Sequence, residues 1–142
     1  MNSKALTASA VALAASVVFG ASASAETVKM KATLNGASEV PPTTSTGTGS
    51  ADVTYDTASK RLTWTVIYSG LTGPATMAHF HGPAEPDKNA PPAVTITDLK
   101  SGTEGSATLT DAQAADLLGG RYYVNVHTDA NKGGEIRGMV TK

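Results

Sequence analysis

Alternation of apolar and polar residues with a period of two constrains the fold of this chain more than any other feature of its sequence. In the clearest case, Leu62, Trp64 and Val66 alternate with Thr63 and Thr65. Residues i and i+2 of a β-strand lie on the same face of the sheet. A segment of this kind therefore predicts a strand with one buried face and one polar face.

Several further segments show this alternation or a short apolar run between turn residues. The predicted strands span residues 27–34, 51–55, 62–68, 76–81, 93–99, 105–109, 121–128 and 134–141. Residues 110–118 predict one short helix, because Thr110 and Gln113 have the spacing of a capping box and Gly119-Gly120 follows. Together these elements predict an all-β fold, an antiparallel Greek-key sandwich or barrel of about eight strands with one short helix.

The segment between the first two predicted strands, residues 35–50, is rich in Thr, Ser, Gly and Pro. Such a composition is typical of a surface loop. Its two closely spaced glycines, Gly47 and Gly49, lack the Lys and the following helix of a phosphate-binding loop. We therefore predict a flexible surface loop without a phosphate-binding site for this segment.

The first 25 residues have the features of a bacterial secretory signal peptide. Lys4 supplies a positive charge, residues 5–20 are a run of mostly small and apolar residues, and an Ala-x-Ala site ends at Ala25. We expect cleavage after Ala25, a single mature domain over residues 26–142, and a location in the periplasm or outside the cell. The apolar run is too short and too rich in small residues for a convincing membrane span, so no membrane insertion is expected.

Composition limits the partners of the chain. Its 142 residues include no Cys, carry a formal net charge of −1 and are only 5% aromatic. The absence of a basic patch argues against nucleic acid and anionic membrane surfaces as partners. Without Cys, stability must come from packing or from a bound metal. A homodimer through exposed edge strands is one open outcome, because nothing in the sequence selects an oligomeric state.

The three histidines of the chain lie in two short motifs that predict a metal site. His79 and His81 form an H-x-H pair and would share one face of a strand, about 6.5–7 Å apart. His127, from a neighbouring strand, would complete a site with three nitrogen ligands. Imidazole suits Cu, Zn and Ni, and the affinity order of divalent metals favours Cu(II). We therefore predict a copper site at these histidines, with zinc less favoured and Met77 as a weak thioether ligand.

Four polar residues of the later strands are predicted to surround this site. Alternation places Asn125 on the face of His127, and Glu135 with Arg137 on one face of the last strand. If these strands are neighbours, the side chains form one polar wall. Glu135 and Asp129 are candidates for accepting an imidazole hydrogen bond. Arg137 is expected to pair with Glu135 or another carboxylate, or else to steer a small anion towards the metal.

These motifs resemble the CHRD domain, a module named for its occurrence in chordin and common in secreted bacterial proteins. The matching stretches are 62–66 with 69–71, AHFHGPA at 78–84 and YYVNVHTDANKGGEIRG at 122–138. The resemblance covers roughly residues 28–142 and implies an extracellular or periplasmic all-β domain without a settled biochemical activity. It carries the motif histidines over onto His79, His81 and His127. Phe80 stands where family members often have a β-branched residue, which should not disturb a metal site.

A looser likeness connects the chain to copper/zinc superoxide dismutases, which are also Greek-key β proteins with an H-x-H strand. The chain lacks their disulfide cysteines and the additional histidines of their zinc site. Three functions are therefore open. The favoured one is a module that buffers, stores or carries copper, for which no catalytic residue is assigned. The alternatives are a copper-dependent redox enzyme, for example one that dismutes superoxide, and a structural or protein-binding module without metal.

Overall fold

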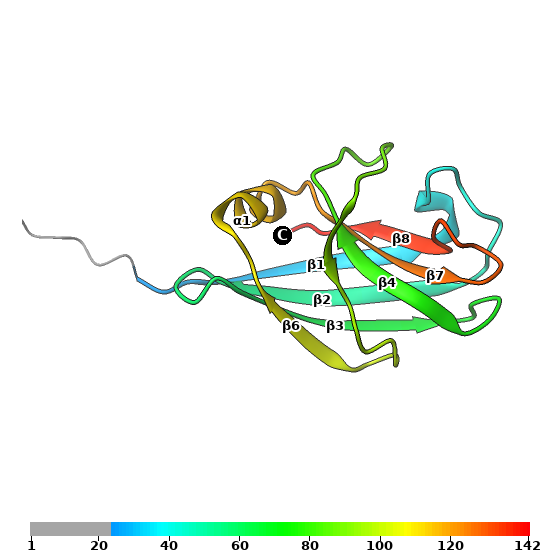
Figure 1. Cartoon of the computed structure of the whole chain (residues 1–142), viewed down its shortest axis with the longest axis horizontal. Coiled ribbons are helices and arrows are strands. Elements are labelled where there is room, and N and C mark those ends of the chain that lie inside the picture. Colours follow the sequence, from blue (N-terminus) through cyan, green and yellow to red (C-terminus); the bar gives the residue numbers. More distant parts are fainter. Residues whose placement is uncertain (1–23) are drawn as a thin grey trace, which may run out of the picture.

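The computed structural model describes residues 24–142, which form one antiparallel sheet that curls into a nearly closed barrel (Figure 1). The strands are β1 (Thr27–Asn35), β2 (Thr48–Asp56), β3 (Arg61–Ser69), β4 (Ala75–His81), β5 (Pro92–Thr95), β6 (Glu104–Thr108), β7 (Tyr123–Thr128) and β8 (Ile136–Met139). Their order is β5-β4-β7-β8-β1-β2-β3-β6. Within these residues the helices are α1 (Asp111–Leu118) and one turn of 3-10 helix, η1 (Gly36–Ser38). The predicted all-β fold with about eight strands and one short helix is confirmed.

Strands β1, β2 and β3 form a meander with continuous pairing. The β1–β2 register runs from Thr27 opposite Asp56 to Asn35 opposite Thr48. β2 therefore begins before the predicted start at Ala51, because pairing on both sides extends it through residues without apolar alternation. The chain then crosses from β3 to β4 in the other half of the sheet, so that neighbours in sequence are not neighbours in space.

The inner surface of the barrel forms one hydrophobic core. Trp64 of β3 and Phe80 of β4 meet edge to face, with ring centroids 5.2 Å apart, and so connect the two halves of the sheet. Helix α1 adds Ala114 and Leu117 to the core at one end of the barrel, opposite to the end where η1 lies (Figure 1). The core also includes Met30, Leu34, Val53, Leu62, Val66, Ala78, Leu109, Tyr122, Val124, Val126, Ile136 and Val140.

The helix has the predicted capping box. Thr110 Oγ1 accepts a hydrogen bond from the backbone N–H of Gln113, and the Gln113 side chain accepts one from the backbone N–H of Thr110. An ion pair of 2.7 Å between Lys60 and Asp111 joins the start of the helix to the β2–β3 turn. The local signal in the sequence thus placed the helix correctly.

The later strands are shorter than predicted. β5 ends at Thr95, β7 begins at Tyr123, and β8 covers only Ile136–Met139. Alternation continues beyond these ends, but a strand also requires a partner at the right distance, which sequence pattern does not report. β8 reaches β1 because of Gly138, where a Cβ atom would collide with the backbone of Thr33.

No helix among residues 24–142 is long and apolar enough to cross a membrane. Most of the predicted signal peptide, residues 1–23, lies outside the described residues, so its cleavage stays a prediction. β1 begins at Thr27, just beyond the predicted cleavage point.

Substituting Phe80→Ala should lower the free energy of unfolding by about 3–5 kcal/mol, because it leaves a cavity beside Trp64. Urea denaturation followed by the fluorescence of Trp64, the single Trp of the chain, measures this change. Ile67→Ala is the control, since Ile67 is 53% exposed and its loss should change stability by no more than about 0.5 kcal/mol. Equal effects of the two substitutions would contradict the assignment of inner and outer faces.

Candidate metal centre

Strands β4, β7 and β8 lie side by side and divide their side chains between two faces. The core face carries Ala78, Phe80, Val124, Val126 and Ile136. The opposite face carries His79, His81, Asn125, His127 and Arg137. The register places His79 opposite Asn125, and Asn125 opposite Arg137. The predicted polar wall is confirmed for these five residues, and it lies on the outside of the barrel.

The three histidines converge on this wall. One ring nitrogen from each of His79, His81 and His127 lies within 4.8 Å of the other two. His79 Nδ1 and His127 Nε2 are 3.4 Å apart. Bonds of about 2.0–2.1 Å from imidazole nitrogen to a metal place the nitrogens about 3–4 Å from one another. The 3.4 Å separation lies in this range, whereas the widest separation in the group, up to 4.8 Å, is longer, so a bound metal would draw the three rings closer together.

Backbone carbonyls orient two of the rings. His81 Nδ1 donates to the carbonyl of Ala90 at 2.8 Å, and His127 Nδ1 donates to the carbonyl of Lys132 at 2.8 Å. Ala90 lies in the β4–β5 loop and Lys132 in the β7–β8 loop. A proton on Nδ1 leaves the lone pair on Nε2, which is the tautomer that a metal requires there. The fold thus selects which nitrogen of each ring faces the cluster.

Burial and neighbouring groups favour the neutral form of the His79 and His81 rings. Burial lowers the pKa of His79 below its usual value, and the neighbouring His81 and His127 lower it further. Burial also lowers the pKa of His81, although its hydrogen bonds with Ala90 and Asn125 act in the opposite direction. Both rings are therefore neutral at pH 7 and can serve as nitrogen ligands without first losing a proton.

Asn125 lies between His81 and His127. Its Oδ1 atom is 2.9 Å from Nε2 of each ring. The side chain of Asn125 is only 1% exposed. The sequence predicted Asn125 as a neighbour on the wall, whereas the structure brings it into direct contact with two of the three candidate ligands.

Tyr123 connects the histidines to Arg137. Its ring stacks on His81, with centroids 4.8 Å apart and planes 6° from parallel. The guanidinium of Arg137 lies 3.9 Å from the centroid of the same ring. The Tyr123 hydroxyl accepts a hydrogen bond from the backbone N–H of Ala90 at 3.2 Å. This contact helps to hold the loop whose carbonyl orients His81.

Arg137 is buried in an ion pair. Its Nε donates to Glu39 Oε2 at 3.0 Å, and the two residues are only 2% and 3% exposed. Its terminal nitrogens donate to the carbonyl of Lys88 at 3.1 Å and to Asn89 Oδ1 at 2.6 Å. The expected pairing of Arg137 with a carboxylate is confirmed. Because each of its three guanidinium nitrogens donates a hydrogen bond and the side chain is buried, Arg137 does not present a free charge that would steer an anion.

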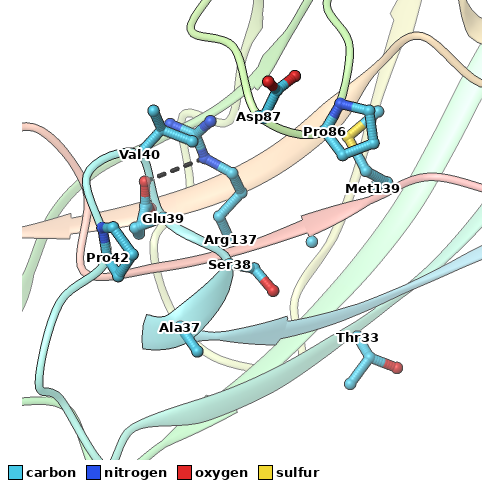
Figure 2. A pocket seen from close by; sticks show the side chains of 11 residues that line it. Thr33, Ala37, Ser38, Glu39, Val40, Pro42, Pro86, Asp87, Arg137 and Met139 are labelled. Carbon is cyan, nitrogen blue, oxygen red and sulfur yellow. Dashed lines mark hydrogen bonds and ion pairs between the residues drawn. The ribbon is translucent and has the colours of Figure 1, made fainter.

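Glu39 is the residue of this region that sequence reasoning missed. It follows η1 in the segment predicted to be a surface loop, yet it is buried. Burial raises the pKa of its carboxyl group, and Arg137 opposes this effect. Figure 2 shows Glu39 and Arg137 together beside a groove of about 610 Å³ between the η1 loop and the β4–β5 loop. No local pattern marks Glu39, because its burial depends on a partner 98 residues further along the chain.

Glu135 belongs to a different cluster. Its carboxylate accepts hydrogen bonds from Ser45 Oγ and Thr128 Oγ1, both at 2.6 Å, and from the backbone N–H and hydroxyl of Thr72 at 2.8 and 2.9 Å. Among the described residues it makes no hydrogen bond with a histidine and none with Arg137. Thr128 points to the side of β7 away from the histidines. Because Glu135 hydrogen-bonds with Thr128, its side chain does not lie on the polar wall where the sequence predicted it.

Met77 and Asp129 lie at the margin of the cluster. Met77 is opposite His127 in the β4–β7 register and is 46% exposed. Asp129 is exposed in the turn after β7. Since the carbonyls of Ala90 and Lys132 orient two of the imidazoles, the structure assigns no such hydrogen bond to Asp129.

Comparison with known proteins gives the family. The family model of the CHRD domain matches residues 30–140, and the chain belongs to this family. The match includes the three histidines and, outside the two motifs, Glu39. Neither a curated protein nor a solved structure matches the chain. The looser likeness to copper/zinc superoxide dismutases therefore stays an analogy from sequence.

The Glu135 cluster makes stability depend on pH. Burial raises the pKa of Glu135, but the hydrogen bonds from Ser45, Thr128 and Thr72 outweigh it and lower the pKa from 4.5 to about 2. A carboxylate with a depressed folded-state pKa contributes stability that is complete above its unfolded pKa and is lost as the pH falls through the folded pKa. The wild type should therefore lose this contribution between about pH 5 and pH 2.

Glu135→Gln should lower the free energy of unfolding at neutral pH by about 2–3 kcal/mol and flatten its dependence on pH in that acidic range. Urea denaturation at several pH values measures both effects. Glu104→Gln, at an exposed position of the edge strand β6, is the control and should keep the wild-type profile. An equally steep acidic decline in Glu135→Gln would show that other carboxylates cause it.

Proposed function

We propose that this CHRD-domain protein binds a transition metal, with copper preferred, at His79, His81 and His127. The bound metal is buffered, stored or transferred in the periplasm or outside the cell. Export is proposed from the signal-peptide features of residues 1–25, and the metal from the histidine cluster.

One observation carries this proposal: the fold aims imidazole lone pairs at a common point. His81 and His127 each donate through Nδ1 to a backbone carbonyl, which leaves both Nε2 lone pairs directed into the cluster. His79 Nδ1 is 3.4 Å from one of these atoms. Lone pairs directed at a common point favour a cation between them, and a transition-metal ion is a cation that imidazole binds well.

Copper is preferred because of the donors and their surroundings. Three imidazoles without thiolate suit Cu, Zn and Ni, and the affinity order of divalent metals places Cu(II) first. His79 is only half-buried, so that the cluster is open to solvent on its side. Met77 is exposed beside it and is proposed as a weak or transient thioether ligand during transfer.

The two alternative functions, a redox enzyme and a structural module, differ in the support that they have. A redox enzyme that uses Arg137 to steer an anion finds no support, because Arg137 is buried and paired with Glu39. A structural module would use the same histidine contacts to fasten the β4–β5 and β7–β8 loops to the sheet. Self-association through the edge strands β5 or β6 is the kind of homodimer that this sheet offers.

A titration of metal-free protein with Cu(II), Cu(I) and Zn(II) tests the function. The wild type should bind one equivalent of copper, more tightly than zinc. Replacing His81 or His127 with Ala should weaken copper binding by at least about 100-fold. Loss of a residue that only hydrogen-bonds to a metal ligand already lowers metal affinity by about 10–100-fold, and loss of a ligand should cost more. Asp129→Ala is a control from the same region and should bind as the wild type does.

Circular dichroism and thermal unfolding of the same variants separate metal binding from a structural role. Loss of copper binding in a folded His81→Ala or His127→Ala variant supports the proposal. Unchanged copper binding in these variants, or no stoichiometric binding by the wild type, contradicts it. A drop in melting temperature without any change in metal affinity would favour the structural module.

A further inference from the structure

We infer that Asn125 is a direct ligand of the metal through Oδ1, and that the buried Glu39 and Arg137 pair orients its amide for this purpose. The inference rests on the proposed metal-binding function. It adds an amide oxygen to the three imidazole nitrogens and gives a role to two buried charges near the site.

The first argument is the chemistry of the contacts around Asn125. His81 and His127 use their Nδ1 protons on the carbonyls of Ala90 and Lys132, so both Nε2 atoms present lone pairs. Asn125 Oδ1, which also carries only lone pairs, is 2.9 Å from each of them. When both rings are neutral, these three atoms offer only lone pairs to one another, and a metal ion bound by all three makes the arrangement favourable.

The second argument is geometric. With metal–ligand bonds of about 2.0–2.2 Å, a separation of 2.9 Å between oxygen and nitrogen corresponds to an angle of about 90° at the metal. The 3.4 Å separation between His79 Nδ1 and His127 Nε2 corresponds to about 110°. One ion can therefore satisfy these three separations, and the histidine nitrogens that are up to 4.8 Å apart would move slightly closer on binding. Two angles near 90° favour the tetragonal geometry of Cu(II) or Ni(II) over a tetrahedral zinc site.

The third argument is the direction of the Asn125 amide. Its Nδ2 atom and Glu39 Oε1 lie close to the same point, because a Cβ atom on Gly134 would collide with both. Glu39 Oε1 is buried and has no direct hydrogen-bond partner among residues 24–142. The positive edge of the amide thus faces the carboxylate, and a reversed amide would place two oxygens against each other. Glu39 consequently directs Oδ1 towards the histidines.

Arg137 stabilises this arrangement. It neutralises Glu39 through Oε2 at 3.0 Å and leaves Oε1 facing the amide. It also lies on the ring of Tyr123, which in turn stacks on His81. The ion pair therefore acts on the metal centre through two of its ligands, although neither Glu39 nor Arg137 touches the metal position.

The test uses Cu(II) and azide with the wild type, Asn125→Ala and Asn125→Asp. Azide gives a charge-transfer absorption band when it binds Cu(II) at an open equatorial position. In the wild type Oδ1 fills that position, so the band should be weak. Asn125→Ala should bind copper at least about 100-fold more weakly and show a strong azide band. Asn125→Asp retains an oxygen donor and should keep the band weak while shifting the copper electron paramagnetic resonance spectrum.

The controls distinguish failure of the inference from failure of the function. Asn131→Ala removes an amide from the β7–β8 turn and should resemble the wild type. If the wild type binds one Cu(II) and its azide band is as strong as that of Asn125→Ala, then Asn125 is not a ligand. The proposed histidine site would still stand. If the wild type binds no copper, the proposed function itself fails. Should Asn125→Ala not fold, Asn125→Asp still decides, since an unchanged copper spectrum would overturn the inference.

A second variant tests the positioning role of Glu39. Glu39→Gln keeps the shape of the side chain but removes the charge that directs the amide, so the copper spectrum should become heterogeneous as both amide orientations are populated. A purely structural role would lower the melting temperature and leave a single wild-type spectrum. That outcome would contradict the role assigned to Glu39.

Discussion

The buried ion pair between Arg137 and Glu39 is the interaction on which the outer face of this barrel depends. Arg137 joins β8 to the η1 loop through Glu39 and to the β4–β5 loop through Lys88 and Asn89. Isolated buried charges are costly, so such a pair persists only where its geometry is well satisfied. Each of the three guanidinium nitrogens of Arg137 donates a hydrogen bond, and the flat side of the group covers Tyr123. Loops that pattern alone would leave mobile are thereby fixed beside the histidines.

The same strands build the core and the candidate metal centre. In β4, Phe80 is fully buried against Trp64, while His79 and His81 on either side of it face outward. A ring anchored in the core limits how far its neighbours in the strand can move. The site is therefore supported from beneath by the hydrophobic core and from above by two loops, a common way to hold metal ligands in a fixed geometry.

Membership of the CHRD family does not by itself assign a chemistry, which has to be argued from the site. The relevant feature of the site is the arrangement of its hydrogen-bond acceptors. Backbone carbonyls take the Nδ1 protons, and the remaining lone pairs, together with the oxygen of Asn125, point inward. This arrangement distinguishes the cluster from surface histidines and gives it the donors to hold a metal ion, which is the basis of the proposed copper binding.

Local sequence pattern was enough to predict the approximate positions of the strands, their two faces, the helix cap and the three candidate histidine ligands, but not the exact ends of the strands. These follow from local rules, since alternation with a period of two and the Thr110–Gln113 spacing are properties of short segments. Tertiary structure alone decided that Glu39, rather than Glu135, pairs with Arg137. It also decided that Asn125 touches two histidines and that carbonyls from two loops orient the rings. Each of these contacts depends on how loops far apart in the chain pack against the sheet, and residue spacing carries no information about that packing.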